Sequence, residues 1–290
     1  MTPPANADPF DRPALRAARE DEEILALRAG GAQDPALRAA RNPWLARVRH
    51  ALDEDLFVLH VQPILSLREN AVTHHEVLLR LADGPHGTLV TPDRFLPAAE
   101  RGGLIGEIDR MVLGKAAALL ATVQRAHGLA QRISVNVSAL SITDGALLAE
   151  LDRALARHGA DPCGLILEVT ETAAISDMDA AAAFCAQAER LGCAIALDDF
   201  GAGFGSFQYL KRLPFTYLKI DGEFIRALPS SRIDQLLVKA LVGIVSGIGR
   251  LTVAEFVGDE TTLEMLRSYG VDFAQGYAIG RPAAIPAAYL

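Results

Sequence analysis

Residues 194–205 read AIALDDFGAGFG, so a short apolar run ends in two adjacent carboxylates and is followed by glycine at every second position. The apolar run is typical of a strand that is buried on both faces and presents polar chemistry only at its end. Neighbouring side chains on a regular strand point to opposite faces. Asp198 and Asp199 can therefore serve one site only if the backbone bends there, and the glycines that follow permit such a bend.

The aspartate pair has two interpretations. Two carboxylates held close together repel each other unless a cation or a proton lies between them. A divalent metal ion is the simplest such cation, and Mg²⁺ and Mn²⁺ prefer oxygen ligands. In the alternative, one aspartate caps a helix and the other is solvated. The rest of the chain has to decide between a metal site and this ordinary helix start.

The composition indicates a soluble α/β protein. The chain has 290 residues, 50% of them hydrophobic, which suits one large domain with a short extension or two small domains. With 28 basic and 36 acidic residues the net charge is −8, which argues against broad nucleic-acid binding. The odd set of Cys163, Cys185 and Cys193 is typical of free thiols in a reducing compartment. Neither a signal peptide nor a membrane segment is expected, so we expect a cytoplasmic location.

The sequence divides near residue 43. Residues 1–43 are rich in Ala, Arg, Asp and Glu, and the string PALRAAR occurs at 13–19 and again at 35–41. We expect this segment to be a flexible or helical leader that could contact a regulatory partner or a second copy; a loosely ordered tail is the alternative. Residues 44–290 are expected to form the main domain.

The main domain is expected to open with a helix and an antiparallel hairpin and then to alternate helix and strand. The predicted strands span residues 57–65, 73–81, 132–137, 164–169, 193–198, 217–220, 251–255 and 272–275. The predicted helices span residues 42–52, 92–101, 106–127, 142–158, 177–191, 206–212, 231–249 and 259–269. This order predicts an α/β fold, a (β/α)₈ barrel of the TIM type with an irregular, antiparallel first strand. A doubly wound open sheet is the alternative, weakened because no Gly-x-Gly-x-x-Gly turn follows the first strand.

Polar side chains recur at or near the carboxyl ends of the predicted strands, where barrel enzymes hold their active sites. They are Glu76, Asn136, Glu168, Asp198, Asp199, Lys219, Glu255 and Gln275, with Arg80 a little beyond Glu76. Five of them offer hard oxygen ligands, namely Glu76, Asn136, Glu168, Asp198 and Asp199. No cysteine or histidine stands at a predicted strand end, which argues against Zn²⁺.

The inventory favours phosphoryl chemistry with two metal ions. Lys219 could neutralise developing charge, and Glu255 could bind a metal ion or help to accept a proton. Gln275 could orient the attacking water, and Arg80 suits a phosphate oxygen. A cluster so rich in carboxylates accepts an anionic substrate only if metal ions reverse the local field, so a phosphodiester is the expected substrate class.

Several short segments follow one another in order along the main domain. They are QPI at 62–64, FLPAAE at 95–100, SVNVS at 134–138, EVTE at 168–171, LDDFG at 197–201, YLKRLP at 209–214, LKID at 218–221, AE at 254–255 and QGY at 275–277. With these segments, from about residue 45 to residue 282, the chain resembles the EAL-type cyclic-di-GMP phosphodiesterases. The namesake segment of that family appears as Glu76-Val77-Leu78, with valine in the middle place.

The resemblance implies a barrel that hydrolyses cyclic di-GMP to linear pGpG with two Mg²⁺ or Mn²⁺ ions in bacterial second-messenger signalling. The implied ligands of one ion are Glu76, Asn136, Glu168 and Asp198, and those of the other include Asp198 and Asp199. The implied groups that hold or activate the water are Lys219, Glu255 and Gln275. Gln62 and Arg80 match substrate-binding positions, and Glu171 matches a glutamate that braces the loop after the aspartates. In the family this loop and a nearby helix form a homodimer contact that is coupled to activity.

Two departures from the family pattern stand out. In the first, Gly258 stands where the family often has a glutamate after the seventh strand, and Asp259 or Glu260 could substitute for that glutamate. In the second, residues 203–206 read GFGS, where a tyrosine and two serines are usual. A catalytically weak sensor that binds cyclic di-GMP and acts through a protein partner is the main rival function. The complete ligand set argues against it. An unrelated metal-dependent barrel hydrolase is the third hypothesis.

Overall fold

The computed structural model of the chain describes residues 43–82, 88–201 and 208–286. These residues form two compact units. Within the described ranges, the smaller unit comprises residues 43–58 and 80–105, and the larger comprises residues 59–79 and 106–286. The predicted leader lies outside the described residues apart from Pro43, and so does the GFGS segment at 203–206.

The smaller unit is built from two helices and the outer end of a hairpin. Helices α3 (Pro43–Asp53) and α4 (Pro92–Arg101) lie so close together that a Cβ atom on Gly102, at the end of α4, would collide with the side chain of Leu45 in α3. The rings of Phe57 and Phe95 lie 5.5 Å apart between centroids and fill the interior. Strand β3 (Leu89–Val90) pairs antiparallel with the end of β2.

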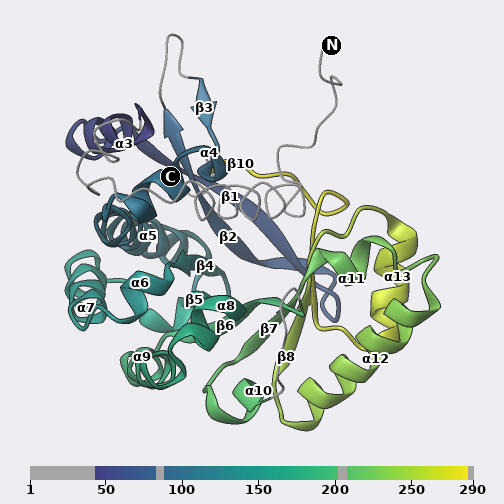
Figure 1. Cartoon of the computed structure of the whole chain (residues 1–290). Coiled ribbons are helices and arrows are strands. Elements are labelled where there is room, and N and C mark those ends of the chain that lie inside the picture. Colours follow the sequence, from purple (N-terminus) through teal and green to yellow (C-terminus); the bar gives the residue numbers. More distant parts are fainter. Residues whose placement is uncertain (1–42, 83–87, 202–207, 287–290) are drawn as a thin grey trace, which may run out of the picture. The chain divides into compact units, whose positions relative to one another are not determined.

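The larger unit is a closed barrel of eight strands (Figure 1). They are β1 (Phe57–Ser66), β2 (Ala71–Ala82), β4 (Arg132–Val137), β5 (Leu165–Thr170), β6 (Ala194–Phe200), β7 (Tyr217–Ile220), β8 (Leu251–Ala254) and β9 (Phe273–Gln275). The pairing runs β1-β9-β8-β7-β6-β5-β4-β2 and closes through β1 and β2. Strand β1 is antiparallel to β9, whereas β2 and β4 to β9 pair in parallel. The predicted barrel with an irregular first strand is confirmed, and closure excludes the open sheet.

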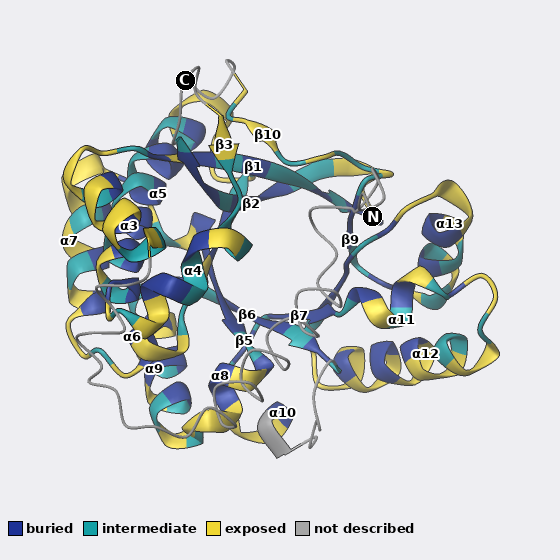
Figure 2. Cartoon of the chain, turned by 45° about the horizontal axis from the view of Figure 1, so that its top comes forward, coloured by how far each residue is buried: buried dark blue, intermediate teal, exposed yellow. Residues whose placement is uncertain are grey.

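Helices lie outside the strands of this barrel. They are α5 (Ile105–His127), α6 (Ala139–Ile142), α7 (Leu147–His158), α8 (Glu171–Ser176), α9 (Met178–Leu191), α10 (Gln208–Arg212), α11 (Gly222–Arg226), α12 (Arg232–Gly247) and α13 (Glu260–Tyr269). A short 3₁₀ turn (Pro162–Gly164) precedes β5, and β10 (Ala283–Ala284) pairs antiparallel with β1. Figure 2 shows that α9, α12 and α13 bury the side that faces the strands and expose the other.

Local chemistry explains where several helices begin and end. The Asp177 carboxylate caps α9 by accepting the Ala180 N–H at 3.0 Å, and Gly192, with φ of 102°, ends that helix. Of the predicted helix 142–158, residues 147–158 are observed as α7, whereas Ile142 is the last residue of the separate helix α6. Helices α8 and α11 were not predicted, since they are too short to carry a helical period.

The barrel interior is arranged in layers. An apolar cluster contains Ile64, Ile166, Ala196, Tyr217 and Val253, with Phe273 packed against it. On a strand, side chains two residues apart point to the same face. The residues two positions beyond this layer, toward the carboxyl ends of the parallel strands, are Glu168, Asp198, Lys219, Glu255 and Gln275. The layered interior therefore carries the polar residues one step above an apolar floor.

None of the helices in the described ranges combines the length and the apolar character that crossing a membrane requires.

Candidate functional site

The strand register of the barrel brings most of the predicted site residues together. Asn136 pairs with Glu168 across β4 and β5, and Glu76 stands opposite Ser134 on the other side. Strand β1 runs antiparallel to the other barrel strands, so the polar layer lies on the N-terminal side of Ile64 in this strand. Gln62 precedes Ile64 by two residues and therefore belongs to the polar layer. The side chains of Glu76, Glu168, Asp198, Lys219, Glu255 and Gln275 are all buried.

Lys219 stands at the centre of the acidic cluster. Its side chain is 1% exposed, and its Nζ atom lies 2.7 Å from Glu168 Oε2, 3.0 Å from Glu255 Oε1 and 3.1 Å from Asp198 Oδ1. Glu76 Oε2 is further away, at 3.8 Å. Burial by itself would lower the pKa of Lys219, but the surrounding carboxylates, with Asp198 the strongest, raise it well above its ordinary value. Lys219 is therefore a fixed positive charge at neutral pH.

The carboxylates outnumber the charge that Lys219 can neutralise. Burial raises the pKa of Glu168 to about 8; the charge of Lys219 opposes this rise, and the neighbouring Glu76 and Asp198 carboxylates add to it. If every group is ionised, the five carboxylates of Glu76, Glu168, Asp198, Asp199 and Glu255 exceed the one ammonium by four charges. Buried charge of one sign is costly unless it is paired. Two divalent cations would balance it, so the donor set fits the implied metal ions.

Amide side chains hold Glu76 from both sides. Asn136 Nδ2 donates to Glu76 Oε1 at 2.8 Å, and Gln275 Nε2 donates to Glu76 Oε2 at 2.6 Å. Gln275 Nε2 also donates to Gln62 Oε1 at 3.1 Å, while Gln62 Nε2 donates to the carbonyl of Gly280 at 3.0 Å. The side-chain NH₂ groups of Asn136 and Gln275 thus donate to Glu76. Their side-chain carbonyl oxygens are left to bind a metal ion or a water molecule. Gln275 Oε1 is buried and has no hydrogen-bond partner within the described part of the chain.

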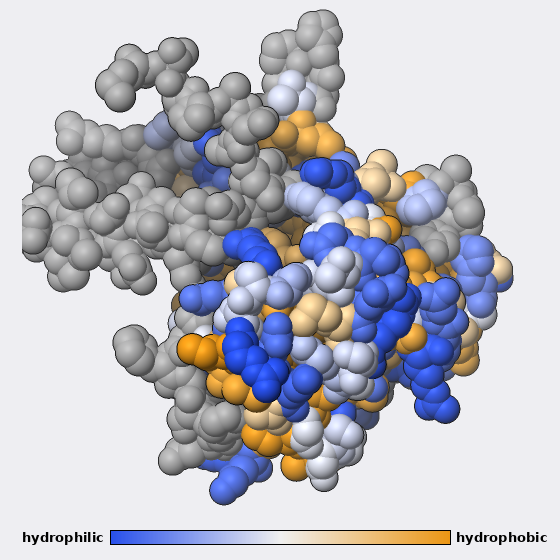
Figure 3. Space-filling model, turned by 90° about the vertical axis from the view of Figure 1, so that its right-hand side faces the viewer, coloured by the Kyte–Doolittle hydropathy of each residue, from blue (hydrophilic) through white to orange (hydrophobic). Residues whose placement is uncertain are grey.

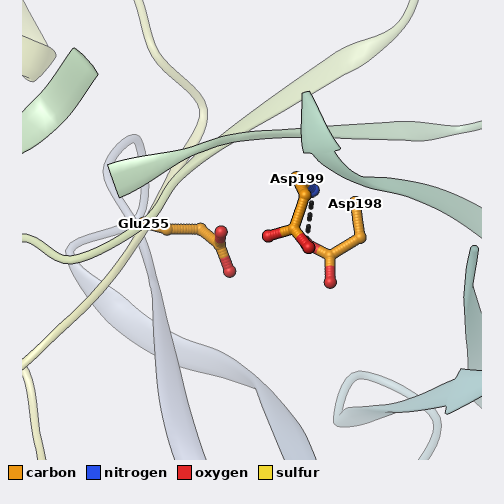
Figure 4. Close-up of side chains that lie close together, drawn as sticks. All are labelled: Asp198, Asp199 and Glu255. Atoms are coloured by element: carbon orange, nitrogen blue, oxygen red, sulfur yellow. Dashed lines mark hydrogen bonds between the residues drawn. The ribbon is translucent and has the colours of Figure 1, made fainter. Parts of the chain in front are cut away.

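The backbone bends at the aspartate pair, as the sequence requires for both to serve one site. Asp199 has a φ of 56°, and the pairing of β6 with β7 shifts register between Leu197 and Phe200. The Asp199 N–H donates to Asp198 Oδ1 at 2.9 Å. Figure 4 shows the carboxylates of Asp198, Asp199 and Glu255 directed toward a shared space, and one oxygen from each lies within 4.8 Å of the others. The bend is centred on Asp199 itself, whereas the sequence argument attributed it to the following glycines.

Glu171 lies at the start of α8, next to the aspartate pair but outside the Lys219 cluster. Its side chain is buried, and its Oε2 atom accepts the Gly201 N–H at 2.8 Å. This contact fixes the residue at which the chain leaves β6. Bracing of the loop beyond Gly201 stays a prediction, because residues 202–207 lie outside the described ranges.

Two other sequence expectations have different outcomes. Arg80 is buried and lies on β2 four residues beyond Glu76, but it belongs to the smaller compact unit, so its phosphate contact stays a prediction. Asp259 Oδ1 caps α13 by accepting the Thr262 N–H at 2.8 Å, so this carboxylate already has a structural role next to Gly258.

Sequence reasoning missed two features beside the cluster, which are the short helix α11 and the left-handed conformation of Phe256. Asp221 caps α11 by accepting the Glu223 N–H at 2.7 Å, and an aspartate followed by a helix-compatible segment is a usable signal for a helix start. The positive φ of a phenylalanine has no comparable sequence signal.

Comparisons with known proteins agree with this geometry. A family profile described as the EAL domain matches residues 45–282. The chain is 36% identical over 236 residues to "Cyclic di-GMP phosphodiesterase PdeF" of Escherichia coli K12, covering 81% of this chain and 31% of that protein. It is 39% identical over 235 residues to "Bifunctional diguanylate cyclase/cyclic di-GMP phosphodiesterase MucR" of Pseudomonas aeruginosa, covering 81% of this chain and 34% of that protein. The chain thus spans about a third of the length of these curated relatives.

Solved structures give the same result. The structure titled "PaMucR Phosphodiesterase, c-di-GMP complex" superposes with a TM-score of 0.79 and 38% identity, covering 84% of this chain and 98% of that one. The FimX EAL domain from Pseudomonas aeruginosa bound to c-di-GMP superposes with a TM-score of 0.77 and 32% identity, covering 83% of this chain and 97% of that one. Similarity therefore extends over most of the chain in both sequence and structure.

Proposed function

The chain belongs to the EAL domain family, and on that basis we propose that it is a metal-dependent phosphodiesterase that hydrolyses cyclic di-GMP to linear pGpG. The observation that carries the proposal is the buried acidic cluster around Lys219, where Asp198, Asp199 and Glu255 each bring an oxygen within 4.8 Å of the others. Two relatives named as cyclic di-GMP phosphodiesterases and two similar domains solved with c-di-GMP support the choice of substrate.

We propose that two Mg²⁺ or Mn²⁺ ions bind here. One is held by Glu76, Asn136, Glu168 and Asp198, and the other by Asp198 and Asp199 with help from Glu255. The excess of carboxylates over Lys219 supports divalent cations, and the all-oxygen donor set supports these two elements. When bound, such ions supply Lewis-acid stabilisation of phosphoryl charge and a nucleophile at neutral pH.

The protein's own residues have complementary roles. The raised pKa of Lys219 keeps it protonated, so it supports negative charge that develops at the phosphoryl group and does not accept a proton. Gln275 is held through Glu76 and Gln62, which leaves its buried Oε1 to orient the attacking water. Glu255 binds a metal ion or accepts a proton. Gln62 and Arg80 contact the substrate, and Gln62 would have to exchange one of its present hydrogen bonds to do so.

We also propose a homodimer, with α12 as its contact. Four large apolar side chains of this helix are exposed, Ile233 by 70%, Leu236 by 52%, Leu237 by 48% and Ile244 by 43%, and Ile248, which directly follows the helix, is exposed by 48%. Ala240, Gly243 and Gly247 are exposed as well, and the spacing of all eight residues puts them on one face. The opposite face, with Val238, Leu241, Val242 and Val245, is buried. Figure 3 views the side of the molecule that carries α11, α12 and α13, where hydrophobic residues reach the surface in several patches.

A second copy in the antiparallel direction complements this face. Ile233, Leu236 and Leu237 lie in its first half, and in its second half, beside Ile244, no atom lies within 4 Å of a Cβ built on Gly243 or Gly247. An antiparallel partner would place its large residues over these glycines. Charge is complementary too, because α12 has no basic residue in its last turn and the exposed Arg232 of the other copy would approach those carbonyl groups. A self-complementary patch of this kind suits a two-fold dimer.

The remaining proposals concern the rest of the chain. The barrel domain begins near residue 44, which the match of the family profile from residue 45 supports. A regulatory partner of residues 1–43 stays a proposal, because residues 1–42 lie outside the described ranges.

The deciding experiment is incubation of the purified protein with cyclic di-GMP and Mn²⁺, followed by chromatography of the products. Formation of pGpG is expected, and Asp198→Ala should abolish it. Tight binding of cyclic di-GMP without pGpG would favour the sensor. Hydrolysis of other phosphodiesters but not of cyclic di-GMP would favour an unrelated hydrolase.

A further inference from the structure

Phe256 directly follows Glu255 and has a left-handed backbone, with φ of 54°. A bulky residue rarely adopts a positive φ, because Cβ then crowds the neighbouring carbonyl oxygen. The other non-glycine residues with positive φ in the described ranges are Asp55, Asn70 and Asp199, types that tolerate this conformation better. A strained conformation persists only when its surroundings hold it in place. The contacts of the Phe256 ring therefore matter for the position of Glu255.

The first and the last residue of helix α11 both pack against the Phe256 ring. A Cβ atom on Gly222, the first residue of α11, would lie 2.6 Å from Phe256 Cγ, so the ring fills the space that a larger residue would need. The guanidinium carbon of Arg226, the last residue of α11, lies 4.2 Å from the ring centroid. Gly222 does not have a positive φ, so close approach alone explains why glycine is required there.

The same helix also contacts the segment that carries the aspartate pair. A Cβ atom on Gly201 would lie 2.9 Å from Phe224 Cζ, and Phe224 is the middle residue of α11. Gly201 is two residues beyond Asp199 and is tied to Glu171 through its N–H. Helix α11 thus packs against the chain just after Asp199 and just after Glu255, which are two of the three groups in the candidate metal cluster.

The left-handed turn at Phe256 also connects Glu255 to a third site segment. Directly after the turn, the Val257 N–H donates to the carbonyl of Gln275 at 3.0 Å, and the Val257 carbonyl accepts the Ala278 N–H at 3.0 Å. The turn thus lies between Glu255, which directly follows β8, and the contact with Gln275 at the end of β9. The backbone strain is therefore located where three segments of the site meet.

We propose that α11 sets the distance between Glu255 and the Asp198–Asp199 pair, with Phe256 and Phe224 as positioning residues for the second metal ion. This inference rests on the proposed metal site. Neither phenylalanine touches substrate in this assignment; both act through the backbone that carries the acidic ligands. Loss of such supporting contacts typically weakens metal affinity by about 10- to 100-fold.

The test is Gly222→Ala, which adds a methyl group where the Phe256 ring lies. Mn²⁺ binding to the EDTA-treated protein is measured by calorimetry, and the spin coupling between two neighbouring Mn²⁺ ions is measured by electron paramagnetic resonance. We expect the weaker of two Mn²⁺ affinities to fall by about tenfold or more and the coupling to change, while the tighter site stays close to wild type. Gly114→Ala is the matched control, because no atom lies within 4 Å of a Cβ at that helical glycine. Wild-type Mn²⁺ binding and coupling in folded Gly222→Ala would overturn the inference.

A double variant keeps the test decisive. The three atoms nearest to the added methyl group all belong to the Phe256 side chain, so Phe256→Gly should remove most of the melting-temperature loss caused by Gly222→Ala. Additive losses would contradict the proposed contact. If Gly222→Ala does not fold, Phe256→Leu takes its place in the Mn²⁺ titration, with the same expected loss and the same refuting result. Absence of Mn²⁺ binding by the wild type would instead refute the proposed function, so the two failures are distinguishable.

Discussion

The buried excess of negative charge predicts that the metal-free protein loses stability as pH rises. Burial raises the pKa of Glu168 to about 8, from an ordinary value of 4.5. In that interval the folded state binds one more proton than the unfolded state, so the free energy of unfolding must fall with increasing pH. The slope is about 1.4 kcal/mol per pH unit for one proton.

The window has to avoid other titrating groups. Burial lowers the pKa of His74 from 6.5 to about 3 and also lowers that of His75, so both affect stability mainly below pH 6.5 and in the opposite direction. Burial raises the pKa of Cys185 and Cys193 from 9 to about 12, which acts only at more alkaline pH. Between pH about 6.5 and about 8, Glu168 alone should lower stability by about 2 kcal/mol.

The assay is urea unfolding of EDTA-treated protein across this window, repeated with Mn²⁺ and with Glu168→Gln. Mn²⁺ should abolish or reverse the slope, because bound cations keep the carboxylates ionised. Glu168→Gln should abolish it without metal, because the titrating group is gone. A flat or rising free energy of unfolding in the metal-free wild type, or an unchanged slope in Glu168→Gln, would refute the reasoning.

The other predictions concern the central lysine, the choice of metal ion and the dimer. Lys219→Met should abolish turnover and destabilise the metal-free protein near pH 8 by about 3–5 kcal/mol, since it leaves buried carboxylates uncompensated; urea unfolding measures this, and near wild-type stability would contradict it. Ca²⁺ should support binding of cyclic di-GMP but poor hydrolysis, because it is larger and geometrically looser than Mg²⁺; equal pGpG formation with both ions would count against the site geometry. Leu237→Asp should be monomeric by light scattering, because it puts a charge in the proposed α12 contact, and it should fold, because this side chain is already 48% exposed. The control Leu129→Asp, at a site that is 54% exposed and lies outside α12, should stay dimeric. A dimeric Leu237→Asp would exclude the α12 contact.

Much of the fold and the site could be predicted because strand periodicity is simple. Strands β5 to β9 each carry a residue of the apolar layer two positions before a polar one, as in Ala196 before Asp198 and Val253 before Glu255. That spacing puts both on the inward face, so residues from distant parts of the sequence had to meet at one end of the barrel. The need for a bend between Asp198 and Asp199 followed from the same rule.

The rest depended on contacts that local patterns do not encode. The positive φ of Phe256 accompanies its packing against Gly222, which is distant in the sequence. Helix α11 has only five residues, too few for a helical period to be visible. Orientations of amide side chains, such as that of Gln275 toward Glu76, depend on the assembled layer as a whole.

The most direct test of the account is the number of Mn²⁺ ions bound per chain after EDTA treatment and titration. Two ions are expected for the wild type and one for Asp199→Ala, with pGpG formation lost in the variant. Equal numbers of bound ions in both proteins, or no binding by the wild type, would contradict the assignment of the acidic cluster as a two-metal site.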